Sequence, residues 1–333
     1  KTRIQDMTSG SPGRLIILFV IPLMLGNICQ QLYTMVDTMV VGQVAGVEAL
    51  AALGAVDFLM WVVTGISTGL TQGFSIQLSQ YYGAKDFENL RKSLAHSYQL
   101  TAFIAVGVLI LSQSFAALVL TGLHTPSNII GMSLLYLRII FCGIPATAAY
   151  NMFASALRAM GNSKTPLTAM IIASVLNVSL DILFVAGFGW GVAGAAIATV
   201  IAQSFSAVYC FLILRRIDIV HLTRADFMPA SGMNARLMKL GIPVVFQNII
   251  IGVGGLVVQY VINGYGFLFV AGFTATNKLY GLLEMAAISY GYAIVTYVGQ
   301  NLGAGKIDRI RKGVRSSMLL SLLTSLIISA AMF

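Results

Sequence analysis

The sequence has 333 residues, of which 58% are hydrophobic and only 9% are charged. Because a soluble domain carries about 25% charged residues, this composition excludes a soluble enzyme or binding domain and indicates an all-α polytopic membrane protein. A net charge of +9 is also typical of nucleic-acid-binding proteins, so the positions of the basic residues decide between the two interpretations.

Apolar segments long enough to cross a bilayer, which requires about 20 residues, recur along the whole chain. In chain order the nine predicted spans cover residues 15–43, 49–78, 94–121, 128–157, 166–186, 191–214, 240–262, 269–299 and 316–333. Most exceed the minimum length, so we expect the helices to tilt or to extend beyond the lipid.

The connections between these spans alternate in charge. One set, residues 44–48, 122–126, 187–190 and 263–268, contains no Lys or Arg. The other connections and the N-terminal segment hold 18 of the 20 basic residues, Arg158 among them. The positive-inside rule assigns that side, and with it the N-terminus, to the cytoplasm. The basic charge therefore reports membrane topology, and we expect no nucleic-acid partner.

The chain also repeats itself. Residues 80–92 align without gaps to residues 300–312, with five identical positions. Ile21-Pro22 recurs as Ile242-Pro243 at nearly the same offset. Landmarks at one offset indicate two copies of one unit. An even number of spans separates the copies, so they are parallel repeats related by an axis along the membrane normal.

The repeat predicts two lobes. Residues 1–220 form an N-lobe of six transmembrane helices, residues 221–239 form a cytoplasmic linker, and residues 240–333 begin a C-lobe that stops after three helices. We therefore expect about nine helices of a twelve-helix protein, with the C-terminal remainder missing. A genuine nine-span protein is the alternative.

Asp37 is the most informative residue of the first span. Gln30, Tyr33 and Asp37 are spaced i, i+3, i+7 and share one helix face. A carboxylate at this depth is costly unless it faces a cavity, finds a partner or moves an ion. In the second copy Asp37 corresponds to Val257 or Val258. Helix packing as such does not need this carboxylate, which favours a role with an ion or a substrate.

Three further polar side chains are expected near Asp37. Asn177 and Asp181 are four residues apart in the fifth span and point the same way, and Thr199 lies in the sixth span. At about 1.5 Å per residue, Asp37, Asp181 and Thr199 all lie roughly 8–12 Å below the outer surface. The four groups fit an oxygen site for a hard cation such as Na⁺. They also fit a proton site with one carboxylate held protonated beside the other. Alternatively, each group is satisfied separately within the bundle.

Four other ionisable residues lie in the predicted spans. Asp57 and Lys278 are close to the outer surface, where snorkelling or a local pair is the simpler interpretation. Glu284 lies deeper, and Arg138 needs a partner that the sequence does not identify. No nucleophile–base constellation or phosphate-binding glycine motif is present, so we expect no enzymatic activity and no cofactor.

Several motifs together resemble the multidrug and toxic compound extrusion (MATE) family. In this sequence they are Pro22, Val36-Asp37-Thr38 with Gly42, Glu48-Ala-Leu-Ala-Ala52, Gln80-Tyr-Tyr-Gly-Ala84, Arg158-Ala-Met-Gly-Asn-Ser-Lys-Thr-Pro166, Asn177 through Asp181, and Gly191 through Thr199. The match runs over the whole chain and is closest to the prokaryotic DNA-damage-inducible (DinF-like) branch.

The resemblance implies two six-helix lobes around a central cavity and export of organic cations or amphipathic drugs in exchange for inward H⁺ or Na⁺. It implies an N-lobe cation or proton site at Asp37, Asn177, Asp181 and Thr199. Gln30 and Tyr33 would line the substrate cavity, and Pro22 would bend the first helix. The other main bacterial branch has a glutamate in the seventh span, and this chain has no acid there. We expect a monomer in the plasma membrane of a prokaryote.

The main alternative is a lipid-linked precursor flippase of the same broad superfamily. Such a protein needs a strongly cationic cavity for a pyrophosphate headgroup, and only Arg138 and Lys278 are basic residues within the spans. The sequence identifies neither the coupling ion nor the transported compounds.

Overall fold

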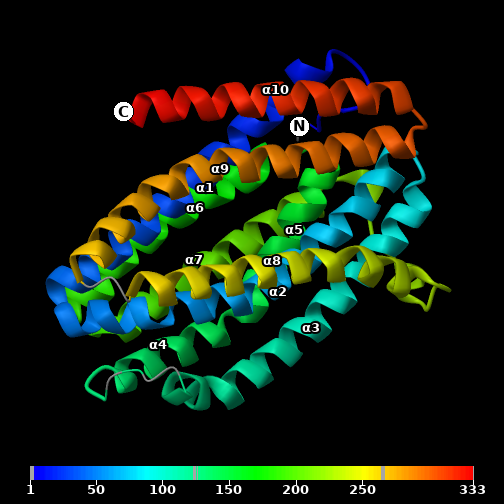
Figure 1. Ribbon diagram of the computed structural model, residues 1–333. Coiled ribbons are helices and arrows are strands. Elements are labelled where there is room, and N and C mark those ends of the chain that lie inside the picture. The colour runs from blue at the N-terminus through cyan, green and yellow to red at the C-terminus, as the bar shows by residue number, and fades with distance from the viewer. Residues whose placement is uncertain (1–3, 123–124, 126, 264–266, 333) are drawn as a thin grey trace.

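The structure is a computed structural model that describes residues 4–122, 125, 127–263 and 267–332. The side chains of helical residues 58, 256, 259, 260, 262, 263, 267–280, 282, 283, 331 and 332 lie outside this description. Every regular element in the described ranges is helical (Figure 1). The predicted all-α class is therefore confirmed.

A helix lies in each of the nine predicted spans. The long helices are α1 (Pro12–Val44), α2 (Val47–Gly83), α3 (Phe87–Gly122), α4 (Ile130–Cys142), α5 (Ile144–Ala159), α6 (Lys164–Asp181), α7 (Gly191–Leu214), α8 (Met233–Asn263), α9 (Phe267–Gly303) and α10 (Ile307–Met332). The short helices are η1 (Ile182–Gly187), η2 (Asp218–Val220) and η3 (Arg224–Phe227). Within the described residues, six helices are long and apolar enough to cross a membrane, or eight if two bent pairs count as single spans.

The predicted span 128–157 is a bent pair of helices. Helices α4 and α5 meet at Gly143 with a bend of 46°. Pro145 lacks the N–H that would continue the helical hydrogen bonding. Gly143 lets the backbone approach α7, because a Cβ at this position would lie 2.7 Å from Cγ2 of Val200. The bend therefore has two causes, the missing N–H of Pro145 and the close packing of Gly143 against α7.

Reciprocal contacts confirm the parallel repeat. A Cβ on Gly83 of α2 would collide with the carbonyl of Gln300 in α9, and a Cβ on Gly303 of α9 would collide with the carbonyl of Gln80 in α2. The two glycines occupy equivalent positions of the two copies, as do the two glutamines. Exchange of equivalent partners is the signature of a two-fold axis. Helix α2 accordingly packs against α3 and α5 of the first repeat and α8 and α9 of the second.

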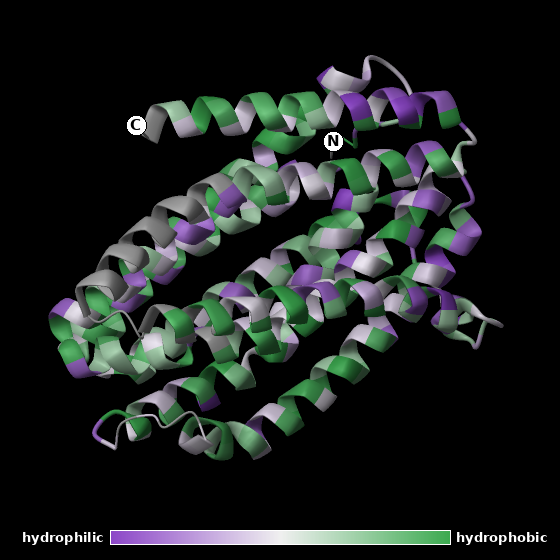
Figure 2. Cartoon of the chain, in the orientation of Figure 1, coloured by the Kyte–Doolittle hydropathy of each residue, from purple (hydrophilic) through white to green (hydrophobic). Residues whose placement is uncertain are grey.

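Polar residues concentrate at one end of the bundle. Figure 2 shows mostly hydrophobic helices, with hydrophilic residues gathered where α2 turns into α3 and α9 turns into α10. We call this the basic end, defined by residues 84–92 and 304–315. Its assignment to the cytoplasm stays a prediction, as do the lobe boundaries. Helix α8 already begins at Met233, inside the predicted linker.

An N-terminal segment, residues 5–10, lies across the basic end and joins the two repeats. The N–H of Gln5 donates to the carbonyl of Gly161 in the first repeat (3.2 Å). Gly161 has φ of +87°, and a Cβ there would collide with Gln5. The buried amide of Gln300, from the second repeat, donates to the carbonyl of Ala159 (2.8 Å). The repeats are thus tied together at this end.

Candidate functional site

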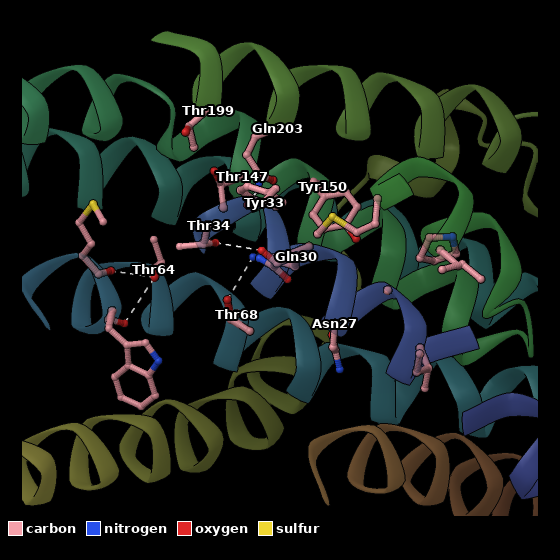
Figure 3. A pocket seen from close by; sticks show the side chains of 18 of the residues that line it. Asn27, Gln30, Tyr33, Thr34, Thr64, Thr68, Thr147, Tyr150, Thr199 and Gln203 are labelled. Carbon is pink, nitrogen blue, oxygen red and sulfur yellow. Dashed lines mark hydrogen bonds between the residues drawn. The ribbon is translucent and has the colours of Figure 1, made fainter. Parts of the chain in front are cut away.

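A cavity of about 420 Å³ runs between the helices of the first repeat and α9. Its lining is mixed, with apolar side chains alternating with hydroxyls, amides and carboxylates. The polar lining residues labelled in Figure 3 are Asn27, Gln30, Tyr33, Thr34, Thr64, Thr68, Thr147, Tyr150, Thr199 and Gln203. A cavity of this size and polarity is typical of a small-molecule site.

Helix α1 contributes one polar face to the cavity. Gln30, Tyr33 and Asp37 all line it, at the i, i+3, i+7 spacing of one helix face. Asp37 is only 5% exposed, whereas Gln30 is exposed. Helix α1 packs against both α6 and α9, as Figure 1 shows. The face therefore lies where α6 and α7 can supply further groups.

The remaining predicted residues lie on α6 and α7. Asn177 and Asp181 are completely buried on α6, and the side-chain amide of Asn177 donates to Oγ1 of Thr199 on α7 (3.4 Å). Thr199 and Asp37 line the cavity. Asn177 and Asp181 are not among the described lining residues of the cavity. They are buried in the helix packing next to it. Asp37 and Asp181 thus lie on α1 and α6, two helices that pack against each other.

Most oxygen atoms of this group are buried without a hydrogen-bond donor among the described residues. They are Oδ1 of Asp37, both carboxylate oxygens of Asp181, and Oδ1 of Asn177. Buried polar atoms are almost always paired, and an unpaired charge in a low-dielectric interior is expensive. Acceptors without donors suit a cation or a proton. No group of three or more His, Cys, Asp or Glu that could hold a metal occurs in the described part of the chain. A bound Na⁺ would therefore depend on two carboxylates with amide and hydroxyl oxygens.

A π-helical turn follows Asp181 directly. η1 continues α6 from Ile182 to Gly187, and the N–H of Phe188 donates to the carbonyl of Leu183 at 2.9 Å. Such turns are rare and frequently lie at functional sites. This wider turn is unlike the regular helix expected for residues 166–186.

We next compared the sequence and the fold with those of known proteins. The MatE family model matches residues 22–183 and 243–333, which lie in both repeats. The chain belongs to the MATE family. It is 31% identical over 308 residues to "Probable multidrug resistance protein YpnP" of Bacillus subtilis, covering 92% of this chain and 69% of that protein. It is 29% identical over 325 residues to "Probable multidrug resistance protein YoeA" of the same organism, covering 95% and 70%.

The fold is also that of solved MATE structures. The chain matches the structure described as "Outward-facing conformation of a multidrug resistance MATE family transporter of the MOP superfamily" with a TM-score of 0.92 and 23% identity, covering 99% of this chain and 74% of that one. The predicted MATE-like helical fold is therefore confirmed, and the protein is a transporter-family member rather than an enzyme.

Within this MATE chain, Gln203 is a site residue that the sequence did not identify. Its side-chain amide on α7 donates to the hydroxyl of Tyr33 on α1 (3.2 Å), and its Oε1 has no donor among the described residues. Gln203 lies four residues after Thr199 and lines the same cavity. That i, i+4 spacing on the sixth predicted span was the available signal.

Pro22 lies inside α1, buried and against the cavity. Proline has no N–H, so the carbonyl of Leu18 loses its helical partner. Helix α1 nevertheless continues from Pro12 to Val44 as one element. Bending at Pro22 stays a prediction.

The other ionisable residues have varied surroundings. Asp57 lines the same cavity as Asp37, rather than only snorkelling. Arg138 is exposed on α4. Glu284 is exposed and is not among the described lining residues, and the side chain of Lys278 lies outside the described residues. Arg158, predicted to lie in a connection, lies in the last turn of α5 and lines the cavity, and its assignment to the cytoplasmic side stays a prediction.

Proposed function

We propose that the native protein is a secondary antiporter that exports cationic or amphipathic small molecules in exchange for inward H⁺ or Na⁺. Asp37 and Asp181 are the coupling carboxylates, and Asn177 and Thr199 are neutral ligands. The observation that supports this most is the group of buried oxygen acceptors without donors beside the cavity. The printed descriptions of YpnP and YoeA as probable multidrug resistance proteins support a drug-like substrate.

The coupling follows from a shared carboxylate. Asp37 belongs both to the cavity lining and to the buried acceptor group. A cationic substrate and the coupling ion therefore compete for the same negative charge. Each ligand lowers the affinity for the other, and this reciprocal effect is what exchange requires. Gln30 and Tyr33 contribute polar contacts to the substrate.

Further details of the proposal come from the sequence. The predicted depth puts the carboxylates in the outer half of the membrane, which suits ion entry from outside. Helix α8 carries no acidic residue, so coupling by the first repeat favours the DinF-like branch. We propose a monomer in a prokaryotic plasma membrane, with the N-terminus and the basic end in the cytoplasm.

A flippase for lipid-linked precursors is less well supported. Among the described lining residues, Asp37 and Asp57 are acidic and Arg158 is the basic one. This balance suits a cation better than a pyrophosphate headgroup.

Transport by the native protein in proteoliposomes tests the proposal. With a fluorescent organic cation on both sides, an inward Na⁺ or H⁺ gradient should drive dye export against its own gradient. The ion whose gradient drives export is the coupling ion. Dye movement that responds to neither gradient would exclude an antiporter, and stimulated movement of a pyrophosphate-linked lipid would support the flippase instead.

A further inference from the structure

Arg158 is a half-buried arginine at the end of a helix of the first repeat. It lies in the last turn of α5 and lines the cavity from the first repeat. Its guanidinium lies over the ring of Tyr292 on α9, with 4.8 Å from Cζ to the ring centroid. One of its nitrogens donates to Oγ of Ser155 at 2.9 Å. The guanidinium is therefore fixed in orientation between the two repeats.

The protein closes over Arg158 from the basic end. Met160, Asn162 and Ser163, which follow it in the chain, are all buried. The carbonyl of Ala159 accepts from Gln300, and the N-terminal segment covers Gly161. Because the turn after α5 is covered, the half-buried guanidinium meets open space on the side of the cavity.

No acidic side chain in the described ranges forms an ion pair with Arg158. An arginine within a membrane protein normally pairs with an acid or marks a substrate pathway. A guanidinium has five N–H donors in a planar fork, and Ser155 accepts from one nitrogen. The remaining donors match a carboxylate or phosphate, which a planar fork binds through two parallel hydrogen bonds.

The acidic and basic groups lie toward opposite ends of the cavity. Pro22 and Asp37 both line it, so it follows α1 for about 22 Å. Asp37 and Asp57 lie toward the α1–α2 connection. Arg158 lies near the start of α6, where Pro166 and Leu167 also line the cavity.

We propose that Arg158 is a specificity-determining residue that binds an anionic group of the exported molecule. Since Asp37 and Asp57 line the same cavity, the preferred molecule carries a cationic group as well and is a zwitterion. The inference rests on the proposed function, because it concerns the substrate of the same cavity. The cation–π contact with Tyr292 holds the fork in place for this task.

Equilibrium binding to the purified native protein in nanodiscs tests the proposal without any ion gradient. The two probes are tetramethylrhodamine, which carries a carboxylate, and its methyl ester, which is only cationic. Replacing Arg158 by Gln should weaken binding of tetramethylrhodamine by at least about tenfold, since hydrogen bonds between charged groups are strong. Binding of the ester should change by less than about twofold. Arg158→Lys keeps the charge but loses the fork, so it should weaken tetramethylrhodamine binding to an intermediate extent.

Arg138→Gln is the matched control, because Arg138 is exposed on α4 and is not among the described lining residues. It should leave the affinities for both probes unchanged. Equal losses for both probes in Arg158→Gln, or no loss for either, would overturn the inference and leave a purely structural contact with Tyr292. The proposed function would survive that result. Failure of the unmodified protein to bind either probe would overturn both.

Discussion

Asn177 connects the two halves of the proposed ion site. Its amide nitrogen donates to Thr199, while its amide oxygen is buried without a donor among the described residues. An amide fixed in this way presents its oxygen toward whatever occupies the site. The hydrogen bond between α6 and α7 fixes the orientation of the Asn177 amide. In the proposed site, Asn177 is therefore a preorganised ligand.

Replacing Asn177 by Ala should therefore weaken ion binding without removing a charge. We expect the ion concentration for half-maximal export to rise about tenfold, which corresponds to about 1.4 kcal/mol. Export rates at a series of Na⁺ or H⁺ concentrations measure this. Asn151→Ala is the control, because the Asn151 amide also lines the cavity but donates to Thr68 at 3.1 Å. A similar shift in both variants would contradict a specific role for Asn177.

Sequence spacing was sufficient to predict where the residues of the proposed ion site lie on their helices, although their role stays a prediction. The polar face of α1 follows from periodicity, and the proximity of Asp37 and Asp181 was expected from equal depth. Arg158 was missed because it lies near a helix end that sequence alone assigns to a loop. Its enclosure depends on Gln300, which is distant in the chain. No local pattern carries that information.

The contact between α2 and α9 depends on glycine. Gly83 and Gly303 allow the two helices to approach at equivalent positions, where a Cβ would collide with the partner's backbone. The sequence alignment predicted that these residues are equivalent, but it did not predict that they touch. An internal repeat shows which residues of the two copies are equivalent. Whether equivalent residues touch depends on where the two-fold axis passes through the structure. The bend at Gly143 was likewise not predicted, because its cause includes packing against Val200.

Gly83→Ala should destabilise the helix contact by about 1–3 kcal/mol, because the backbone must shift to accept the methyl group. Thermal unfolding of the purified protein, followed by a thiol-reactive dye or by light scattering, measures the loss. Gly107→Ala is the control in α3, where no atom lies within 4 Å of the added Cβ. That change should leave stability unchanged or slightly raised. Equal stability of the two variants would contradict the close approach.

The whole molecule is closed at the basic end by a small hydrogen-bonded network. The N–H of Met7 donates to Oε1 of Gln300 at 3.0 Å, and Gln300 in turn donates to Ala159. Arg309 donates to the carbonyl of Gly10 at 2.9 Å. The proposed export requires the cavity to open at some stage toward the basic end, which we predict to be cytoplasmic. These contacts must break in that state, so they bias the protein toward the closed basic end.

Gln300→Ala should shift the protein toward a state open at the basic end. Loss of this side chain leaves the N–H of Met7 and the carbonyl of Ala159 without partners, at about 1–3 kcal/mol each. Spin labels on cysteines replacing Glu88 and Asp308, in a background with the three native cysteines changed to Ser, report the distance across this end by pulsed electron paramagnetic resonance. The distance distribution should gain longer values in Gln300→Ala but not in Lys312→Ala, which changes an exposed residue of α10. An unchanged distance distribution in both variants would show that these hydrogen bonds do not hold the basic end closed.

The first repeat has a carboxylate at Asp37 that the second lacks, and the proposed coupling depends on this asymmetry. Replacing Asp37 by Asn keeps the shape of the side chain and removes its charge. Gradient-driven export of an organic cation should then be abolished, while the variant still reaches the membrane. The direct measurement is dye export from proteoliposomes under an imposed Na⁺ or H⁺ gradient, comparing Asp37→Asn with the unmodified protein. Export by Asp37→Asn at the unmodified rate would contradict coupling through this carboxylate.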